Sequence, residues 1–172
     1  MMIRMLLLCT LTLSAWGQWT RLEPLPDKEG FAGAFAGVSS ECLIVAGGTH
    51  FPDKMPWEGG AKVWFDDVYV LADPGGKWSR AGKLPRPNGY GVSLTTRDGM
   101  LLIGGGDARE HFRSVWRLRL EDAKVRLDPL PDLPKPCAFM AGVESGGVVY
   151  LAGGIEHPSD TAALGSFWAL DL

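Results

Sequence analysis

The segment Leu43–Gly48 (LIVAGG) decides the fold, because the sequence contains two further copies of its pattern, Leu101–Gly106 (LLIGGG) and Val149–Gly154 (VYLAGG). Each copy begins with consecutive apolar residues, which predict a short strand buried on both faces. Each copy ends in glycines, which predict a turn at positive φ or the close approach of a neighbouring backbone. A unit that recurs about every fifty residues indicates a repeat architecture.

The segments around these glycine-ended strands also recur in a constant order. A Leu-Pro pair comes first, at 25–26, 84–85 and 133–134, and a segment with small residues follows, at 30–37, 89–93 and 138–142. After the glycine-ended strand come a long loop and a strand with an aromatic residue, at 68–71, 115–118 and 167–170. Four short strands per unit at this period are typical of kelch-type β-propeller blades. The sequence therefore predicts an all-β chain of three four-stranded blades.

The first residues differ in composition from the rest of the chain. Arg4 precedes an apolar run at 5–13 and then Ala15-Trp16-Gly17, which has the small-x-small form of a cleavage site. We predict a signal peptide at 1–17, too short to span a membrane. The mature chain would then be secreted or periplasmic, with no membrane contact after cleavage. The remaining residues, 18–172, form the predicted propeller portion, with blades at about 19–72, 73–121 and 122–172.

Three blades are fewer than the roughly 4–8 blades of a closed propeller. Two arrangements would complete a six-bladed ring: a homodimer of two three-bladed chains, or further blades that belong to a longer polypeptide. An open arc would expose two apolar blade faces. The sequence therefore favours half of a longer protein over a homodimer.

Composition and spacing argue against several classes of partner and cofactor. The formal net charge of −3 provides no basic face for a nucleic acid. The three histidines follow the glycine-ended strands but show no spacing typical of a metal site. The tyrosines and cysteines that a copper enzyme with a galactose oxidase-like propeller needs lie outside these loops. We predict neither a metal nor another cofactor.

The most specific sequence lies in the first two repeats. The segments are 31–38, 43–48, the proline- and tryptophan-containing loop His50–Trp64, 67–71, 89–94 and 101–105. They resemble N-acetylneuraminate epimerases, and their order is similar to that of the cyclically permuted mutarotases. The resemblance covers roughly residues 19–172 and is strongest over 19–120. It implies an exported, six-bladed kelch propeller of carbohydrate metabolism, an isomerase that interconverts the anomers of sialic acid.

The resemblance also implies a catalytic glutamate and arginine six residues apart, just after a blade strand. The nearest spacing here joins Asp107 to Arg113, with aspartate in place of glutamate, and the flanking residues match a different family blade. We therefore expect the blade with the catalytic pair to be missing from this chain. Three readings stay open: an incomplete sugar-acid mutarotase, a kelch module that binds a protein or glycan without catalysis, and a truncated reading frame.

The loops after the glycine-ended strands should emerge at one end of the ring, which makes that end the candidate site. Mutarotation needs a base at the anomeric hydroxyl and an acid at the ring oxygen, and an arginine suits the substrate carboxylate. The catalytic candidates are Asp107, Arg113, His50 and Glu58. The predicted substrate-binding residues are His50, Trp57, Glu58, Lys62, Arg86, Tyr90, Arg109 and His111.

Overall fold

The structure is a computed structural model that describes residues 19–172, so the predicted signal peptide lies outside the described residues. These residues form an all-β fold of three successive antiparallel sheets and a two-stranded hairpin. Their one helical turn is η1 (Pro56–Glu58), a 3-10 helix. Across residues 19–172, no helix has the length and apolar character needed to cross a membrane. The predicted all-β class is confirmed.

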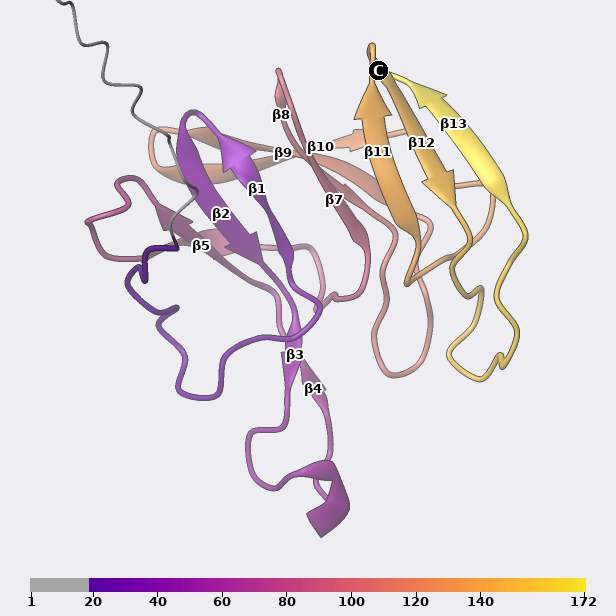
Figure 1. The fold of residues 1–172 in the computed structure, drawn as a ribbon, viewed down its shortest axis with the longest axis horizontal. Helices are drawn as coiled ribbons and strands as arrows, with labels where there is room; N and C mark the ends of the chain where they lie inside the picture. The colour runs from indigo at the N-terminus through magenta and orange to yellow at the C-terminus, as the bar shows by residue number, and fades with distance from the viewer. Residues whose placement is uncertain (1–18) are drawn as a thin grey trace, which may run out of the picture.

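Each predicted glycine-ended strand is a central strand of one sheet. The first sheet contains, in order, β1 (Phe35–Ser39), β2 (Cys42–Ala46), β5 (Asp67–Leu71) and β6 (Ser79–Lys83). The second contains β7 (Val92–Thr96), β8 (Gly99–Ile103), β9 (Val115–Glu121) and β10 (Lys124–Leu130). The third contains β11 (Ala141–Ser145), β12 (Val148–Ala152) and β13 (Phe167–Asp171). The hairpin of β3 (Thr49–His50) and β4 (Val63–Trp64) projects from the loop between β2 and β5 (Figure 1).

The third sheet has three strands within the described residues, whereas four were predicted. In the first two sheets the fourth strand is β6 or β10, which short turns fold back onto β5 or β9. These outer strands lie in the segments that open the next sequence repeat, so each sheet and its sequence repeat are offset by one strand. A strand equivalent to β6 and β10 beside β13 is not among residues 19–172.

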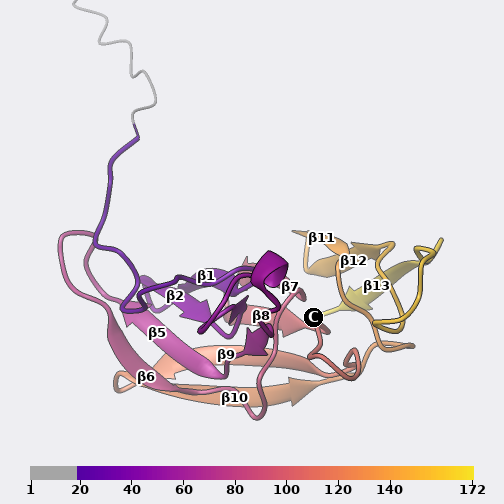
Figure 2. The same ribbon diagram turned by 90° about the horizontal axis from the view of Figure 1, so that it is seen from below.

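The sheets follow one another as blades do around an axis. The inner strand β1 packs against β7, and β7 packs against β11, while the outer strands β6 and β10 pack against each other. Figure 1 shows the three sheets side by side in chain order, and Figure 2 shows β6 and β10 together along one side. The long loops after β2, β8 and β12 therefore emerge at the same end of the sheets.

Two hydrophobic clusters fill the spaces between successive sheets, and β8 contributes to both. Met100 and Leu102 belong to the cluster with the first sheet, and Leu101 and Ile103 to the cluster with the third. All four side chains are at most 2% exposed, and burial of each contributes about 1.5–3 kcal/mol. The prediction of a strand buried on both faces is thus confirmed for β8. In β2, by contrast, Leu43 is 36% exposed, because no sheet covers that face within residues 19–172.

The glycine pairs have both predicted features, a positive φ and the close approach of a neighbouring backbone. Gly47 and Gly48 have φ values of 63° and 96°, in the left-handed region. The Gly48 N–H donates to the carbonyl oxygen of Asn88 in the next blade at 2.8 Å, and Gly105 N–H donates to that of Cys137 at 2.9 Å. A Cβ on Gly47 would lie 2.3 Å from the Asn88 oxygen. The pairs therefore set the distance between neighbouring sheets at the end that carries the loops.

Candidate functional site

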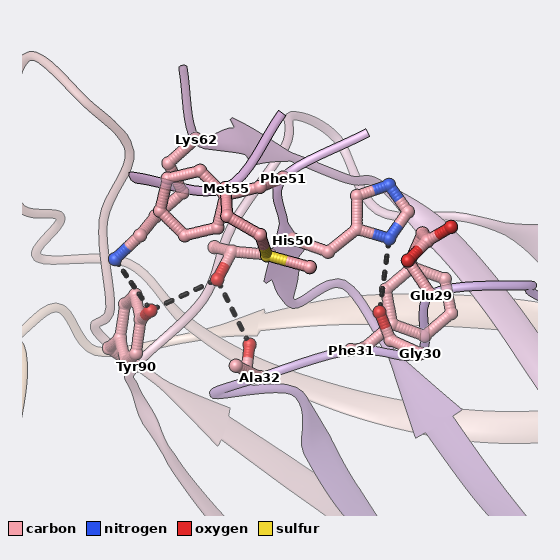
Figure 3. A pocket seen from close by; sticks show the side chains of 10 residues that line it. Glu29, Gly30, Phe31, Ala32, His50, Phe51, Met55, Lys62 and Tyr90 are labelled. Atoms are coloured by element: carbon pink, nitrogen blue, oxygen red, sulfur yellow. Dashed lines mark hydrogen bonds between the residues drawn. The ribbon is translucent and has the colours of Figure 1, made fainter. Parts of the chain in front are cut away.

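A cavity of about 620 Å³ opens at the loop end of the first sheet. Its volume lies within the roughly 300–1,000 Å³ of typical ligand pockets. The lining combines the segment before β1, the loop after β2 and one residue of the second blade (Figure 3). The lining residues are Glu29, Gly30, Phe31, Ala32, Thr49, His50, Phe51, Met55, Lys62 and Tyr90. Three of the predicted site residues, His50, Lys62 and Tyr90, meet here.

A chain of hydrogen bonds crosses one side of this cavity (Figure 3). The Lys62 ammonium donates to the Tyr90 hydroxyl oxygen at 3.0 Å, and that hydroxyl lies 3.0 Å from Thr49 Oγ1. Thr49 in turn donates to the carbonyl oxygen of Ala32 at 3.3 Å. Because a carbonyl can only accept, the Thr49 proton points to Ala32 and the Tyr90 proton points to Thr49. The Tyr90 oxygen therefore keeps one lone pair for a ligand.

The backbone between the blades holds Tyr90 in place. Tyr90 adopts a left-handed conformation with φ of 63°, and its N–H donates to the Gly33 carbonyl at 2.8 Å. Its ring covers Gly33, where a Cβ would lie 2.5 Å from a ring carbon. The ring also stacks on Phe139, with centroids 4.7 Å apart. A side chain held by contacts from two neighbouring blades presents its hydroxyl in a fixed position.

The surroundings of Tyr90 lower its pKa from the ordinary value. Burial alone would raise the pKa, but the hydrogen bonds with Thr49 and Lys62 and the positive charge of Lys62 outweigh that effect. On ionisation, Thr49 can turn its hydroxyl proton from Ala32 toward the phenolate. Tyr90 is therefore suited to give up and regain a proton.

Lys62 stands among aromatic rings at the start of the hairpin strand β4. Its Nζ lies 5.7 Å from the centroids of Phe51 and Trp64 and 5.1 Å from that of Tyr90. No carboxylate of residues 19–172 lies within 4.0 Å of this ammonium. Aromatic faces attract a cation without cancelling its charge. The positive charge of Lys62 is thus available to an anion in the cavity.

His50 lies on the opposite side of the cavity from Lys62 and Tyr90 (Figure 3). Its Nδ1 is 3.0 Å from the Gly30 carbonyl and 3.2 Å from Asp27 Oδ1, both of which are acceptors. Nδ1 therefore carries a proton, and Nε2 of the neutral ring is a base. Phe31 stacks against the imidazole with centroids 5.7 Å apart. This packing orients the ring beside an apolar wall.

A smaller cavity of about 160 Å³ adjoins the first, and Lys62 and Tyr90 line both. Asp107 and His111 also line it. His111 is 7% exposed, and its Nδ1 lies 2.8 Å from the carbonyl oxygen of Ile155. The site thus extends from the first blade toward the third.

Two of the three predicted arginines, Arg86 and Arg113, are engaged elsewhere. Arg86 Nη1 lies 2.8 Å from Glu110 Oε1, and the Arg113 Nε–H donates to the Leu133 carbonyl at 2.8 Å. Both arginines line a third cavity of about 530 Å³ that contains neither Asp107 nor Tyr90. Asp107 and Arg113, the pair with the expected spacing, therefore do not line the same cavity.

The remaining candidates line none of these three cavities. Trp57 is 81% exposed, and Glu58 accepts a hydrogen bond from the Met55 N–H at 3.1 Å. Arg109 is exposed, and its N–H donates to Asp107 Oδ1 at 2.8 Å. Sequence reasoning missed Thr49, whose one signal is that it directly follows the first glycine pair.

The three histidines lie apart. Within residues 19–172, His, Cys, Asp and Glu side chains form no group of three or more that could hold a metal ion. His157 is exposed, with Nδ1 2.7 Å from Ser159 Oγ.

Radially arranged antiparallel sheets with a cavity at their loop end define a β-propeller. The solved structure of YjhT, itself a β-propeller, superimposes with a TM-score of 0.59 and 30% identity, over 64% of this chain and 34% of that one. The sequence model of the N-acetylneuraminate epimerase family matches residues 10–127, more than half of the sequence. The chain belongs to the N-acetylneuraminate epimerase family.

Curated relatives agree with this assignment. An N-acetylneuraminate epimerase of Salmonella arizonae is 36% identical over 126 residues, which are 66% of this chain and 32% of that protein. One of Yersinia pestis is 44% identical over 101 residues, 48% of this chain and 25% of that protein. The chain thus spans about a third or less of the length of these relatives. The cavity residues Thr49, His50, Lys62 and Tyr90 lie inside the segment that the family model matches.

Proposed function

We propose that the chain is part of an exported mutarotase that acts on the anomeric centre of N-acetylneuraminate or a related sugar acid. Membership of the epimerase family supports an epimerase-like activity on a sugar acid. The observation that carries the proposed mutarotase activity is the cavity itself. Tyr90 and Lys62 lie on one side of it, His50 lies on the other, and apolar side chains complete the lining. The leader pattern of residues 1–17 supports export.

Mutarotation opens and closes the sugar ring, and general acid–base catalysis is the help that it needs. A base removes the proton of the anomeric hydroxyl, the bond between the anomeric carbon and the ring oxygen breaks, and the ring oxygen takes up a proton. The open form has a ketone at that carbon. Rotation about the adjacent carbon–carbon bond exposes the other face of the ketone, and the reverse steps close the ring as the other anomer. The reaction needs one proton acceptor and one proton donor.

The cavity provides both groups on opposite sides. His50 offers Nε2 as a base, and Tyr90 offers a phenol whose pKa its surroundings lower. Phe31, Phe51 and Met55 supply apolar surface for the carbon face of a sugar ring. Two groups held by backbone and stacking contacts are ready to act without rearrangement.

A kelch-repeat module that binds a protein or glycan without catalysis is the alternative. One observation favours it: Asp107 and Arg113, which have the spacing of the family's catalytic pair, line different cavities. The exposed aromatic side chains of Trp57 and Phe139 would suit such binding.

The anomer exchange of N-acetylneuraminate, measured by NMR exchange spectroscopy, tests the proposal. The protein should accelerate exchange over buffer, and Tyr90→Phe should lower the acceleration about a hundredfold, the range of a lost general acid or base. His157→Gln is the matched control, because His157 lies outside the cavity. A folded sample that binds the sugar but leaves the exchange rate at the buffer value would favour the binding module.

Three sheets are fewer than the roughly 4–8 blades of a closed ring. We propose that a second copy of this chain or further blades of a longer polypeptide provide the sheets that close the ring. The length of the relatives supports further blades, and the hydrogen-bonding groups at the two ends of the arc, described below, suit either source.

A further inference from the structure

We propose that Lys62 binds the substrate carboxylate, an inference that rests on the function proposed above. The sequence directed attention to arginines for this role, because guanidinium groups pair with carboxylates in two parallel bonds. The structure points instead to a lysine whose ammonium forms no salt bridge with any carboxylate of residues 19–172. Lys62 also lines both cavities of the site.

The hydrogen-bond inventory of the ammonium shows what it can still bind. An ammonium has three N–H donors and no acceptor. One donor is directed to the Tyr90 oxygen at 3.0 Å. The other two have no hydrogen-bond acceptor among residues 19–172. Two donors on one charged nitrogen match the oxygen atoms of a single carboxylate.

The rings of Phe51, Trp64 and Tyr90 hold the ammonium in place before a ligand arrives. Their centroids lie 5.1–5.7 Å from Nζ. A cation held by ring faces loses less conformational freedom on binding than a solvated lysine does, while it keeps its charge. Partial removal of water by the rings also strengthens its attraction for an anion.

Two of the three competing arginines have partners already, and the third, Arg109, is exposed and lines neither cavity of the site. Arg86 pairs with Glu110 and lies over Phe112, 4.5 Å from the ring centroid. Arg113 donates to the Leu133 carbonyl. Neither lines the larger cavity, in which Lys62 is the one lysine or arginine among the lining residues.

This assignment orients the sugar relative to the proton donors and acceptors. In a 2-keto sugar acid, the carboxylate is bonded directly to the anomeric carbon. A carboxylate on Lys62 therefore brings the anomeric hydroxyl beside Tyr90, whose oxygen is the nearest polar neighbour of that ammonium. His50, on the other side of the cavity, then faces the ring. The same lysine thus selects acids and aligns the reacting centre.

Binding of N-acetylneuraminate and of its methyl ester, measured by calorimetry or ligand-observed NMR, tests the inference. The protein should prefer the acid, and Lys62→Met should weaken acid binding about tenfold to a hundredfold, as expected for a lost charge-assisted contact, while binding of the uncharged ester weakens much less. Lys62→Arg should retain part of the preference. Lys54→Met is the control, because it removes the same charge from the same loop at an exposed position outside the cavity.

The outcomes separate this inference from the proposed function. Equal affinity of the unmodified protein for acid and ester, or an unchanged acid affinity in Lys62→Met, overturns the carboxylate assignment even if exchange is accelerated. A selective loss of acid binding in Lys62→Met supports it, even if the protein does not accelerate exchange. Failure of the unmodified protein to bind the acid overturns both.

Discussion

The backbone N–H of Tyr90 donates to the carbonyl oxygen of Gly33 at 2.8 Å, and one blade later the Phe139 N–H donates to Tyr90 at 2.7 Å. All three residues have φ of 60–63°. Equivalent backbone hydrogen bonds therefore join the first sheet to the second and the second to the third, beside the cavity. A second series runs in parallel, from the glycine pairs to Asn88 and Cys137. Tyr90 thus both lines the cavity and forms backbone hydrogen bonds between neighbouring blades.

Both series stop at the ends of the arc with complementary groups. The third sheet offers the Gly154 N–H and the Phe139 carbonyl, and the first offers the Phe31 carbonyl and the Gly33 N–H, none of them bonded within residues 19–172. We expect the chain purified by itself to associate head to tail. Two copies supply six sheets, within the roughly 4–8 blades of a closed ring. Light scattering on a size-exclusion column should give the mass of two chains.

A charge on the open face should prevent this association. Phe167 is 69% exposed on the third sheet, so Phe167→Asp should give a folded monomer. Trp57→Asp is the control, since Trp57 is also an exposed aromatic residue but lies in η1, between β3 and β4. A monodisperse monomer of the unmodified chain would contradict self-association and leave further blades as the source of the closing sheets.

Two glycines at positive φ allow conformational strain to be separated from contact between blades: Gly47 at the end of β2 and Gly146 in the turn between β11 and β12. Gly47 and Gly146 have nearly the same φ, 63° and 64°, but a Cβ on Gly47 would lie 2.3 Å from the Asn88 oxygen, whereas one on Gly146 would meet nothing within 4 Å. Gly146→Ala should lower the free energy of unfolding by about 1 kcal/mol, the cost of a left-handed alanine. Gly47→Ala should lower it by about 3 kcal/mol or more, because overpacking adds to that cost. Urea unfolding measures both, and equal losses would show that the contact between blades is unimportant.

The repeat pattern predicted much of this fold. The glycine-ended strands became the central strands β2, β8 and β12, and their glycines took both predicted roles. The offset of β6 and β10 was not predictable from the repeat, because hairpin pairing, not the sequence period, assigns a strand to a sheet. The exposure of Leu43 likewise depends on which sheets lie beside it.

The sequence predicted the location of the candidate site better than the roles of its residues. Equivalent loops predicted a site at one end of the sheets, and His50, Lys62 and Tyr90 line a cavity at that end. Tyr90 was predicted to bind substrate but not to transfer a proton, because nothing in the sequence shows that Lys62 and Thr49 contact its hydroxyl. Arg113 looked like a catalytic residue by spacing, but its Nε–H donates to the Leu133 carbonyl, and it lines a different cavity from Asp107. Partners supplied by backbone atoms leave little trace in side-chain patterns.

The pKa of Tyr90 should respond to the charge of Lys62. Burial raises this pKa, while the hydrogen bonds with Thr49 and Lys62 and the Lys62 charge lower it further than burial raises it. Lys62→Met removes two of the lowering causes, so the Tyr90 pKa should rise. The ultraviolet absorbance of tyrosinate follows the titration, and subtraction of a Tyr90→Phe sample isolates Tyr90 from Tyr69 and Tyr150. An unchanged titration in Lys62→Met would mean that the two groups do not interact.

The ion cluster on the β9–β10 hairpin should make stability depend on pH in the acid range. Asp128 accepts a hydrogen bond from Arg126 at 3.1 Å and another from Arg119. Burial raises the Asp128 pKa, but the hydrogen bonds and charges of these two arginines together outweigh it and lower the pKa below the ordinary value. The stabilisation is therefore fully present above the ordinary aspartate pKa of about 3.9 and is lost as pH falls through the lower folded-state pKa.

Asp128→Asn removes this dependence, because asparagine does not titrate. At neutral pH the variant should melt at most about 4 °C below the unmodified protein, since exposed ion pairs contribute little. As the pH falls below about 3.9, the two melting temperatures should converge. Asp53→Asn is the control, because Asp53 is exposed and forms no ion pair among residues 19–172. A melting difference that stays constant down to the lowest accessible pH would show that Asp128 acts through its shape and not through its charge.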